Sequence, residues 1–182
     1  LANRERMYLG DSTIGAALKH VMRYVDRKQD NWSDIKECEV DISLVKGQYI
    51  LKGSVDLIVG ENNTVEVIDF KSEKKPDMEK DAERIKHHKR QLEVYAHLIE
   101  ERTGHKVSKM HLYFTGVESG VPTISFDKDG SAIESTVKVF DDIVNRIESK
   151  DFGIAESPVK TCVDCDMKFY CDRKNWKFKE TA

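Results

Sequence analysis

Two segments of this 182-residue chain decide its fold: residues 53–58, Gly-Ser-Val-Asp-Leu-Ile, and residues 65–71, Val-Glu-Val-Ile-Asp-Phe-Lys. Both have the composition of strands, and a Gly-Glu-Asn-Asn turn lies between them, so we predict an antiparallel pair. Side chains alternate between the two faces of a strand, so Asp69 and Lys71 share a face with two valines that should be buried. An acid and a base at the end of an apolar face are costly to bury unless they pair or hold a metal.

The acidic side chains of these two strands point to a specific chemistry. Asp56 and Asp69, from adjacent strands, can bind Mg²⁺ through carboxylate oxygens. A lysine two residues after Asp69 can orient a metal-bound water and help to deprotonate it, which suits phosphodiester hydrolysis. The residue spacing also allows an ordinary, partly exposed Asp69–Lys71 pair with Asp56 in a turn, because Asp-x-Lys is a common sequence.

The rest of the chain alternates between helical and strand periodicity. We predict helices over 14–28, from Pro76 to about 102, and 132–148, and strands over 39–45, 49–59, 64–72, 109–115 and 121–126. The first helix should turn Leu18, Val21, Met22 and Val25 to one side. The second has a helical period in Leu92, Tyr95, Ala96 and Ile99, and Gly104 should end it. The first three strands form an antiparallel meander. The order α-βββ-α-β-β-α predicts an α/β domain with a mixed sheet.

Composition excludes several classes of protein. Charged residues make up 35% of the chain, yet the net charge is only −3, which excludes a globally basic nucleic-acid coat but not a local basic cleft. No apolar run approaches the ~18 residues of a membrane span, so we expect no membrane partner. The chain begins with Leu1, and we expect it to be a piece of a longer protein.

Three of the four cysteines are clustered: Cys162, Cys165 and Cys171 form a C-x2-C-x5-C run. Thiolates at this spacing can converge on one metal ion or iron–sulfur cluster, although unrelated buried or redox cysteines are the alternative. The distant Cys38 lies in a strand-like stretch and should be buried as a small hydrophobic residue. This use of cysteine favours a reducing, cytoplasmic setting.

These motifs together resemble the PD-(D/E)xK nuclease superfamily, and within it the RecB-type nucleases of the iron–sulfur branch, such as AddB nuclease domains and CRISPR-associated exonucleases. His20, on the first predicted helix, is similar to the histidine motif of that family. Gln91 and Tyr95 match its Gln-x-x-x-Tyr motif, and the C-terminal cysteines match its cluster motif. The resemblance runs from about Leu1 to Cys171.

The resemblance implies a fold and an activity. The fold would be a restriction-endonuclease-like core, with a central mixed sheet flanked by helices, over residues 1–152. A small cysteine-rich module would occupy residues 153–182. The activity would be that of a metal-dependent deoxyribonuclease, an exonuclease acting on single-stranded DNA or DNA ends. Its parent would be a larger helicase–nuclease in DNA repair or recombination.

The resemblance also assigns residues to roles. Asp56 and Asp69 would bind Mg²⁺ or Mn²⁺, with His20 and the backbone carbonyl of Phe70 as further ligands, and Lys71 would position the attacking water. Gln91 and Tyr95 would orient the lysine or contact the substrate strand. The basic residues expected to contact DNA are Lys86, Lys89, Arg90, Lys168 and Arg173.

The sequence departs from the family at one position. The iron–sulfur branch binds its [4Fe-4S] cluster with four cysteines, one of which precedes the histidine motif, but no cysteine precedes His20 here. We expect the missing ligand on a segment before Leu1; alternatively, Cys38 or another group replaces it. Two other functions stay open: a non-catalytic DNA-binding module on a nuclease fold, and a zinc-binding interaction domain with a fortuitous Asp-x-Lys.

Overall fold

The computed structural model describes residues 10–29, 32–47 and 49–151. Within them the elements follow the order predicted from the sequence, α-βββ-α-β-β-α. They are α1 (Asp11–Lys28), β1 (Ile35–Lys46), β2 (Tyr49–Glu61), β3 (Thr64–Lys71), α2 (Ala82–Thr103), β4 (Lys106–Phe114), β5 (Thr123–Asp127) and α3 (Gly130–Glu148).

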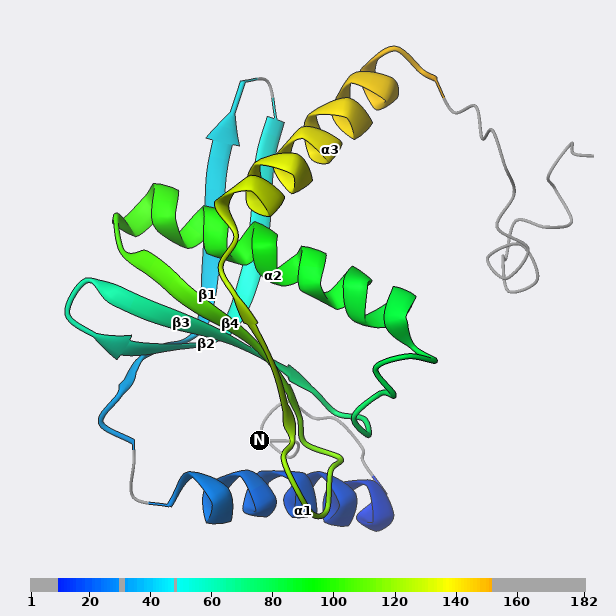
Figure 1. Cartoon of the computed structure of the whole chain (residues 1–182). Coiled ribbons are helices and arrows are strands. Elements are labelled where there is room, and N and C mark those ends of the chain that lie inside the picture. Colours follow the sequence, from blue (N-terminus) through cyan, green and yellow to red (C-terminus); the bar gives the residue numbers. More distant parts are fainter. Residues whose placement is uncertain (1–9, 30–31, 48, 152–182) are drawn as a thin grey trace, which may run out of the picture. The chain divides into compact units, whose positions relative to one another are not determined.

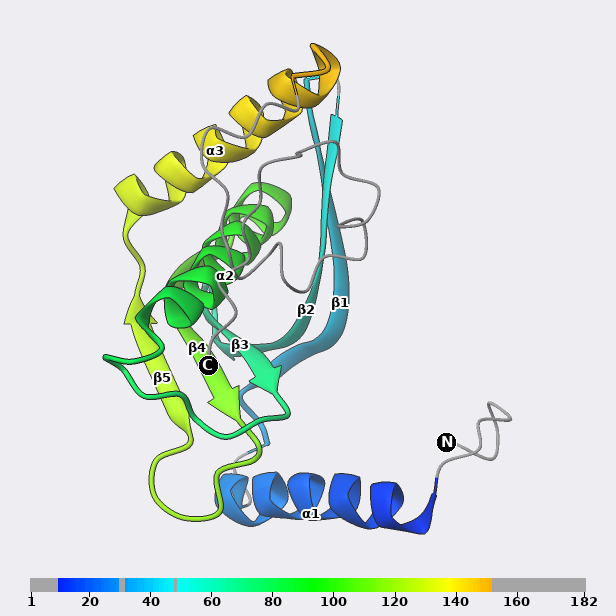
Figure 2. The same cartoon turned by 90° about the vertical axis from the view of Figure 1, so that its right-hand side faces the viewer.

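The five described strands form one sheet in the order β1-β2-β3-β4-β5 (Figure 1). β1, β2 and β3 pair antiparallel, which confirms the predicted meander. β3 and β4 pair in parallel because α2 carries the chain back across the sheet between them, and β5 returns antiparallel. The sheet is therefore mixed, as predicted, and Figure 2 shows β1 and β2 curving along their length.

The main core lies between the sheet and α2. The α2 side chains Leu92, Ala96 and Ile99 are fully buried, as are Val65 and Val67 on β3. Their spacing on α2 is that of one helical face, which is why the sequence pattern located this contact correctly. The first turns of α3 add further apolar contacts to the same core, from Ile133, Val137 and Phe140.

The helix α2 ends where the sequence predicted. Gly104 adopts a left-handed φ of 71° and its N–H bonds back to the carbonyl of Glu100. A residue with a side chain adopts this conformation at a cost that glycine does not bear. The chain then enters β4 directly at Lys106.

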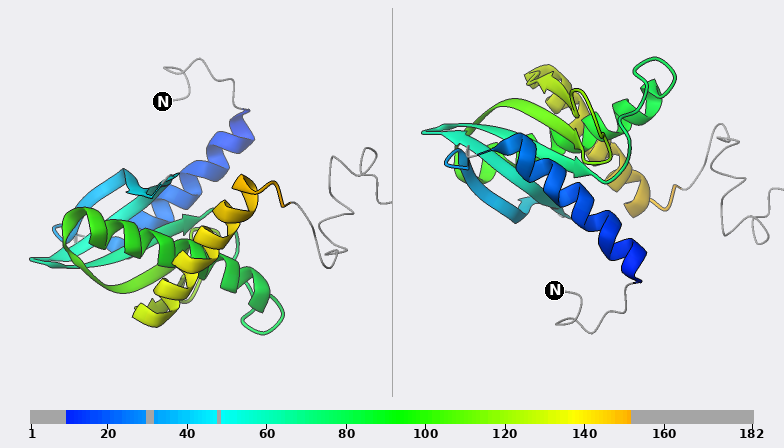
Figure 3. Two further views of the ribbon diagram at one scale, coloured as in Figure 1. Left: turned by 90° about the horizontal axis from the view of Figure 1, so that it is seen from above. Right: turned by 90° about the horizontal axis from the view of Figure 1, so that it is seen from below.

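The helix α1 lies across the opposite face of the sheet from α2 (Figure 3). The apolar residues Leu18, Val21, Met22 and Val25, which were expected on one side of this helix, are between 37% and 58% exposed. Tyr24 makes the contact instead, through edge-to-face packing on neighbouring rings of the sheet. The polar side of the helix faces the protein, where His20, Arg23 and Arg27 form hydrogen bonds with Thr115 and Val117 in the loop after β4.

Cys38 is exposed, which corrects the expectation that it is a buried small residue. The apolar residues at every second position after it on β1 do face the core: Val40, Ile42 and Leu44. Glu39 between them has a left-handed φ of 50°. This conformation interrupts the alternation of side chains along β1. Cys38 therefore does not share the core-facing side of the residues that follow Glu39.

The predicted C-terminal module lies outside the described residues, together with Cys162, Cys165 and Cys171. The domain boundary placed at residue 152 therefore stays a prediction. The chain divides into two units within α3, between Asp141 and Asp142, and the sheet, α1 and α2 belong to the first. None of the helices in the described ranges is long and apolar enough to cross a membrane.

Candidate active site

The structure brings Asp69 and Lys71 together at the end of β3, as strand alternation predicted. The Lys71 Nζ lies 2.6 Å from the Asp69 Oδ2, and Asp69 is only 4% exposed. Burial raises the pKa of the Asp69 carboxyl above its ordinary value, the Lys71 ammonium opposes that rise, and the charge of Asp56 adds to it. Burying a carboxylate beside a second acid costs folding stability, but the same arrangement can bind a cation.

Asp56 lies directly opposite Asp69 on the neighbouring strand. Both occupy the position just beyond the Leu57–Ile68 pair of the β2–β3 ladder. The charge of Asp56 raises the pKa of Asp69, which shows that the two carboxylates lie close enough to interact. The Phe70 backbone N–H donates to the Asp56 Oδ2 at 2.7 Å, which fixes one carboxylate oxygen.

A chain of hydrogen bonds connects the lysine to α2. The Lys71 ammonium donates to the Gln91 Oε1 at 3.2 Å, and the Gln91 Nε2 donates to the Tyr95 hydroxyl at 2.7 Å. Gln91 and Tyr95 are one helical turn apart, so one face of α2 presents both. Gln91 thus lies beside Lys71 and Tyr95 beside Gln91, while their roles in orienting the lysine or contacting the substrate strand stay predictions.

Gly53 makes room for this chain of hydrogen bonds. A Cβ atom at position 53 would lie 2.8 Å from the Tyr95 Cε1 and 3.3 Å from a methyl group of Leu98. Such a separation is far inside van der Waals contact, so a larger residue would displace the Tyr95 ring. Packing against Tyr95 therefore explains why the Gly-x-x-Asp sequence on β2 begins with glycine.

His20 projects from α1 toward the loop after β4. Its Nδ1 lies 2.7 Å from the Thr115 Oγ1. The Thr115 hydroxyl and the Thr115 N–H both donate to the Lys71 carbonyl oxygen, at 3.2 and 2.9 Å. Thr115 thus connects the histidine to the backbone of the Asp-x-Lys strand, a position that the sequence patterns did not single out.

The donor atoms present fit a hard divalent cation. Asp56 and Asp69 supply carboxylate oxygens and Phe70 a backbone carbonyl, which is the type of donor that Mg²⁺ and Mn²⁺ prefer, and Mg²⁺ fills its other positions with water. The mutual repulsion of the two carboxylates is what a bound cation would relieve. No group of three His, Cys, Asp or Glu side chains that could hold a metal occurs among the described residues. The structure therefore does not bring His20 into such a group, and its role as a ligand stays a prediction.

Three residues that the sequence did not assign to this site lie beside it: Glu73, Arg84 and His88. Glu73 follows β3 and forms an ion pair with Arg84 on α2. The His88 Nε2 lies 3.9 Å from the Glu73 Oε1. Burial lowers the pKa of the His88 imidazole, and the nearby Lys71 charge lowers it further. The sequence did carry a signal, because Arg84, His88, Gln91 and Tyr95 recur at the spacing of one helical face.

The basic residues expected to contact DNA fall into two groups. Lys86 and Arg90 are exposed on α2, whereas the Lys89 Nζ lies 3.3 Å from the carboxylate of Glu93 in an ion pair within the helix. Lys168 and Arg173 lie outside the described residues. Their contacts with DNA stay predictions.

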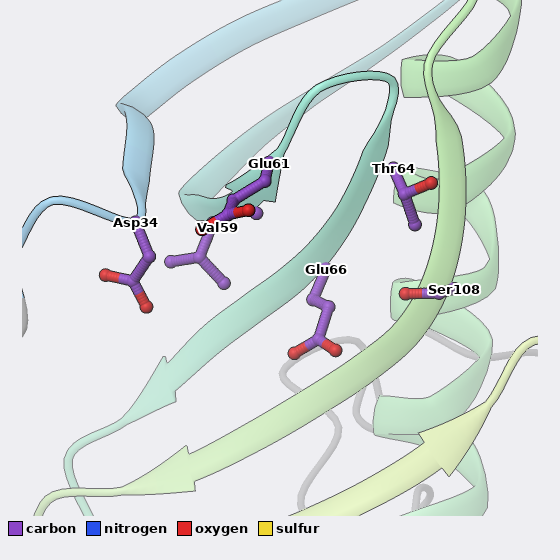
Figure 4. Close-up of a pocket in the computed structure, with 7 residues that line it drawn as sticks. Asp34, Val59, Glu61, Thr64, Glu66 and Ser108 are labelled. Carbon is purple, nitrogen blue, oxygen red and sulfur yellow. The ribbon is translucent and has the colours of Figure 1, made fainter.

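A hollow of about 340 Å³ on the other face of the sheet is separate from these residues (Figure 4). Its lining includes Thr64 and Glu66, which alternate on β3 with the residues that face α2. None of the predicted catalytic residues lines it. The candidate site is instead the cluster at the end of β3, against α2.

The chain is similar in sequence to one protein superfamily and in fold to several solved structures. A model of the PD-(D/E)XK nuclease superfamily matches residues 6–172. None of the curated proteins matches the sequence. Among solved structures, SSO0001 is similar with a TM-score of 0.52 and 19% identity, over 90% of this chain and 71% of that one.

A protein from Eubacterium rectale, provisionally named an exonuclease, has a TM-score of 0.59 and 13% identity over 94% of this chain. The match spans only 64% of that protein's length. At these identities the two likenesses show a shared fold. The superfamily model, by contrast, spans both aspartates, the lysine and the Gln-x-x-x-Tyr motif, and the chain belongs to the PD-(D/E)XK nuclease superfamily.

Proposed function

We propose that this chain is a metal-dependent deoxyribonuclease domain that acts as an exonuclease and uses Mg²⁺ or Mn²⁺. The observation that carries the proposal is the buried Asp69 carboxylate, which has Asp56 opposite it and the Lys71 ammonium 2.6 Å away. Members of the superfamily are nucleases, and this arrangement retains the two acids and the base that phosphodiester hydrolysis requires.

The residues of the chain divide this work. Asp56, Asp69 and the Phe70 carbonyl would hold the cation, which supplies charge for the phosphate and acidifies a bound water. The Lys71 side chain ends beside the buried Asp69, where it can orient the attacking water and stabilise charge on the phosphate. Gln91, bonded to Tyr95, fixes the direction of the Lys71 ammonium.

The narrower assignment is to the RecB type. Its support is the order of motifs, from His20 through the Asp-x-Lys strand to the Gln-x-x-x-Tyr helix and the three C-terminal cysteines. A [4Fe-4S] cluster, a helicase partner or parent, a role in DNA repair and a cytoplasmic location belong to this narrower proposal. The name of the Eubacterium rectale protein is consistent with exonuclease activity.

Two other functions would depend on different parts of the chain. A non-catalytic DNA-binding module would have no need of a buried carboxylate with a raised pKa, whose retention costs stability. A zinc-binding interaction domain would depend on the C-terminal cysteines and not on β3. Metal analysis separates these ideas, because iron with sulfide supports the RecB type and zinc supports the interaction domain.

Linear and circular DNA substrates distinguish an exonuclease, which needs a free end, from an endonuclease. We expect the purified chain with Mn²⁺ to degrade a linear, end-labelled oligonucleotide and to leave a closed single-stranded circle of the same composition intact. Cleavage of the circle would overturn the exonuclease assignment while leaving the nuclease assignment in place. Degradation of neither substrate would contradict the proposed function itself.

A further inference from the structure

A histidine beside the candidate site has an unused hydrogen-bonding atom. The His88 Nε2 is buried and has no hydrogen-bond partner within the part of the chain that the structure describes. Its distance of 3.9 Å from the Glu73 Oε1 is too long for a hydrogen bond. Buried polar atoms are nearly always satisfied, so an unsatisfied one beside a catalytic cluster calls for a functional explanation.

The surroundings of His88 come from two elements. The end of β3 and the segment just after it present Asp69, Lys71 and Glu73, and α2 presents Arg84 and His87. Glu73 is already engaged, because its carboxylate pairs with Arg84. Burial lowers the pKa of the His88 imidazole, the charges of Lys71 and Arg84 lower it further, and the charge of Asp69 opposes them. A neutral imidazole donates one N–H.

We propose that His88 contacts the substrate directly, its Nε2–H donating to a non-bridging oxygen of a phosphate held at the Asp69–Lys71 site. This proposal rests on the proposed function and deepens it, since it assigns a substrate-contacting residue outside the Asp-x-Lys and Gln-x-x-x-Tyr motifs. The incoming phosphate oxygen would satisfy the buried nitrogen and would lie between two donors, His88 and Lys71.

A phosphate fits this position better than a metal ion does. The Glu73 carboxylate, 3.9 Å from the His88 Nε2, already pairs with Arg84, so a cation at His88 would compete with this ion pair. It would also lie among the positive charges of Lys71 and Arg84. A phosphate oxygen is attracted by the same charges and needs only one donor from the ring.

The chain offers a matched control in the preceding residue. His87 has the same chemistry, is exposed, and its ring centroid lies 6.2 Å from that of His88. Successive residues of a helix point about 100° apart, so His87 does not share the face that carries Arg84, His88 and Gln91. His87→Ala and His88→Ala each remove one imidazole from α2, but only His88→Ala removes the proposed donor from the site.

The test compares four variants in two measurements. His88→Ala, His88→Gln, His88→Asn and His87→Ala are assayed for kcat/KM on a labelled single-stranded oligonucleotide with Mn²⁺. Their affinity for the same oligonucleotide is measured by fluorescence anisotropy with Ca²⁺ in place of Mn²⁺. The melting temperature of each variant reports whether it is folded.

We expect His88→Ala to lower kcat/KM by about 10- to 100-fold, the usual loss when a hydrogen bond to a charged group is removed. His88→Gln, whose amide nitrogen reaches the position of Nε2, should recover most of the activity. His88→Asn, whose amide imitates Nδ1, should not. His87→Ala should stay within about twofold of the wild type in both measurements.

Equal effects of His88→Ala and His87→Ala, with both variants folded, would overturn the inference while leaving the nuclease assignment intact. Rescue by asparagine and not by glutamine would also overturn it, because the wrong nitrogen would be in use. A wild type that binds the oligonucleotide without cutting it contradicts the proposed function, and the affinities of the variants then decide the role of His88. Absence of both binding and cleavage overturns both proposals.

Discussion

The Lys71 ammonium lies 2.6 Å from the carboxylate of Asp69, and the acid of this pair is the more deeply buried partner. Most buried ion pairs contribute little net stability, since desolvation offsets their attraction. Here the acid carries a raised pKa and has a second carboxylate opposite it on β2. The pair is therefore better explained by chemistry than by folding.

A divalent cation should stabilise the protein through these carboxylates. We expect Mn²⁺ to raise the melting temperature of the wild type in a concentration-dependent manner, because a ligand that binds only the folded state stabilises it. Asp69→Asn should abolish this rise, and Asp56→Asn should reduce or abolish it. Glu118→Gln, at an exposed position on the loop after β4, serves as the control. An undiminished rise in Asp69→Asn would show that the cation binds elsewhere.

The Gln91 side chain should act on the rate of cleavage and not on substrate affinity. Gln91→Met keeps the size of the side chain but removes the acceptor for Lys71 and the donor to Tyr95. We expect kcat to fall by about 10-fold or more with KM within a few-fold, because the lysine loses its orientation. Tyr95→Phe should have a smaller effect of the same kind. A change confined to KM would mean that Gln91 contacts the substrate instead.

The glycine at position 53 gives a prediction about stability. Gly53→Ala places a methyl group 2.8 Å from the Tyr95 ring, so we expect a loss of about 1–3 kcal/mol in the free energy of unfolding. Gly15→Ala in α1 is the matched control, because nothing lies within 4 Å of the added Cβ. That substitution should instead stabilise the helix by roughly 0.5–1 kcal/mol. Equal effects in urea denaturation would contradict the packing described for Tyr95.

Tyr49 gives a prediction about alkaline pH. Its hydroxyl donates to the Asp141 Oδ1 at 2.7 Å, and burial together with this bond raises the pKa of Tyr49 to about 12. The unfolded chain loses that proton near pH 10, so this contribution to stability is complete below pH 10 and is lost as the pH rises towards 12. In urea denaturation, the wild type should lose more stability than Tyr49→Phe between pH 9 and pH 11.5. Parallel losses in the two proteins would contradict the assignment.

Local patterns predicted most of the fold. The alternation in 65–71 gave the orientation of Asp69 and Lys71, and the helical period of α2 gave its buried face and its end at Gly104. These features depend on residues close together in the sequence. Pairing of the strands followed from the turns between them and from the α2 crossover, which leaves β3 and β4 parallel.

The errors arose where long-range contacts or backbone exceptions decide the outcome. The apolar pattern of α1 does not reveal its contacts, because the helix is held by Tyr24 and by polar groups that bond to a loop some 90 residues away, such as Arg23 with Thr115. Cys38 is exposed because the left-handed Glu39 interrupts the alternation of β1. The environment of His88 is assembled from β3 and α2, so no local pattern in the sequence could place this residue beside Lys71.

The central claim is that the Asp69–Lys71 pair performs metal-dependent hydrolysis of DNA. The most direct test measures cleavage of labelled single- and double-stranded DNA, with Mg²⁺ or Mn²⁺, by the wild type, Asp69→Ala and Lys71→Ala. We predict that the wild type cuts, that chelation stops it, and that each substitution lowers the rate by at least about 10²-fold. Cleavage that survives both substitutions, or that chelation leaves unchanged, would contradict the account.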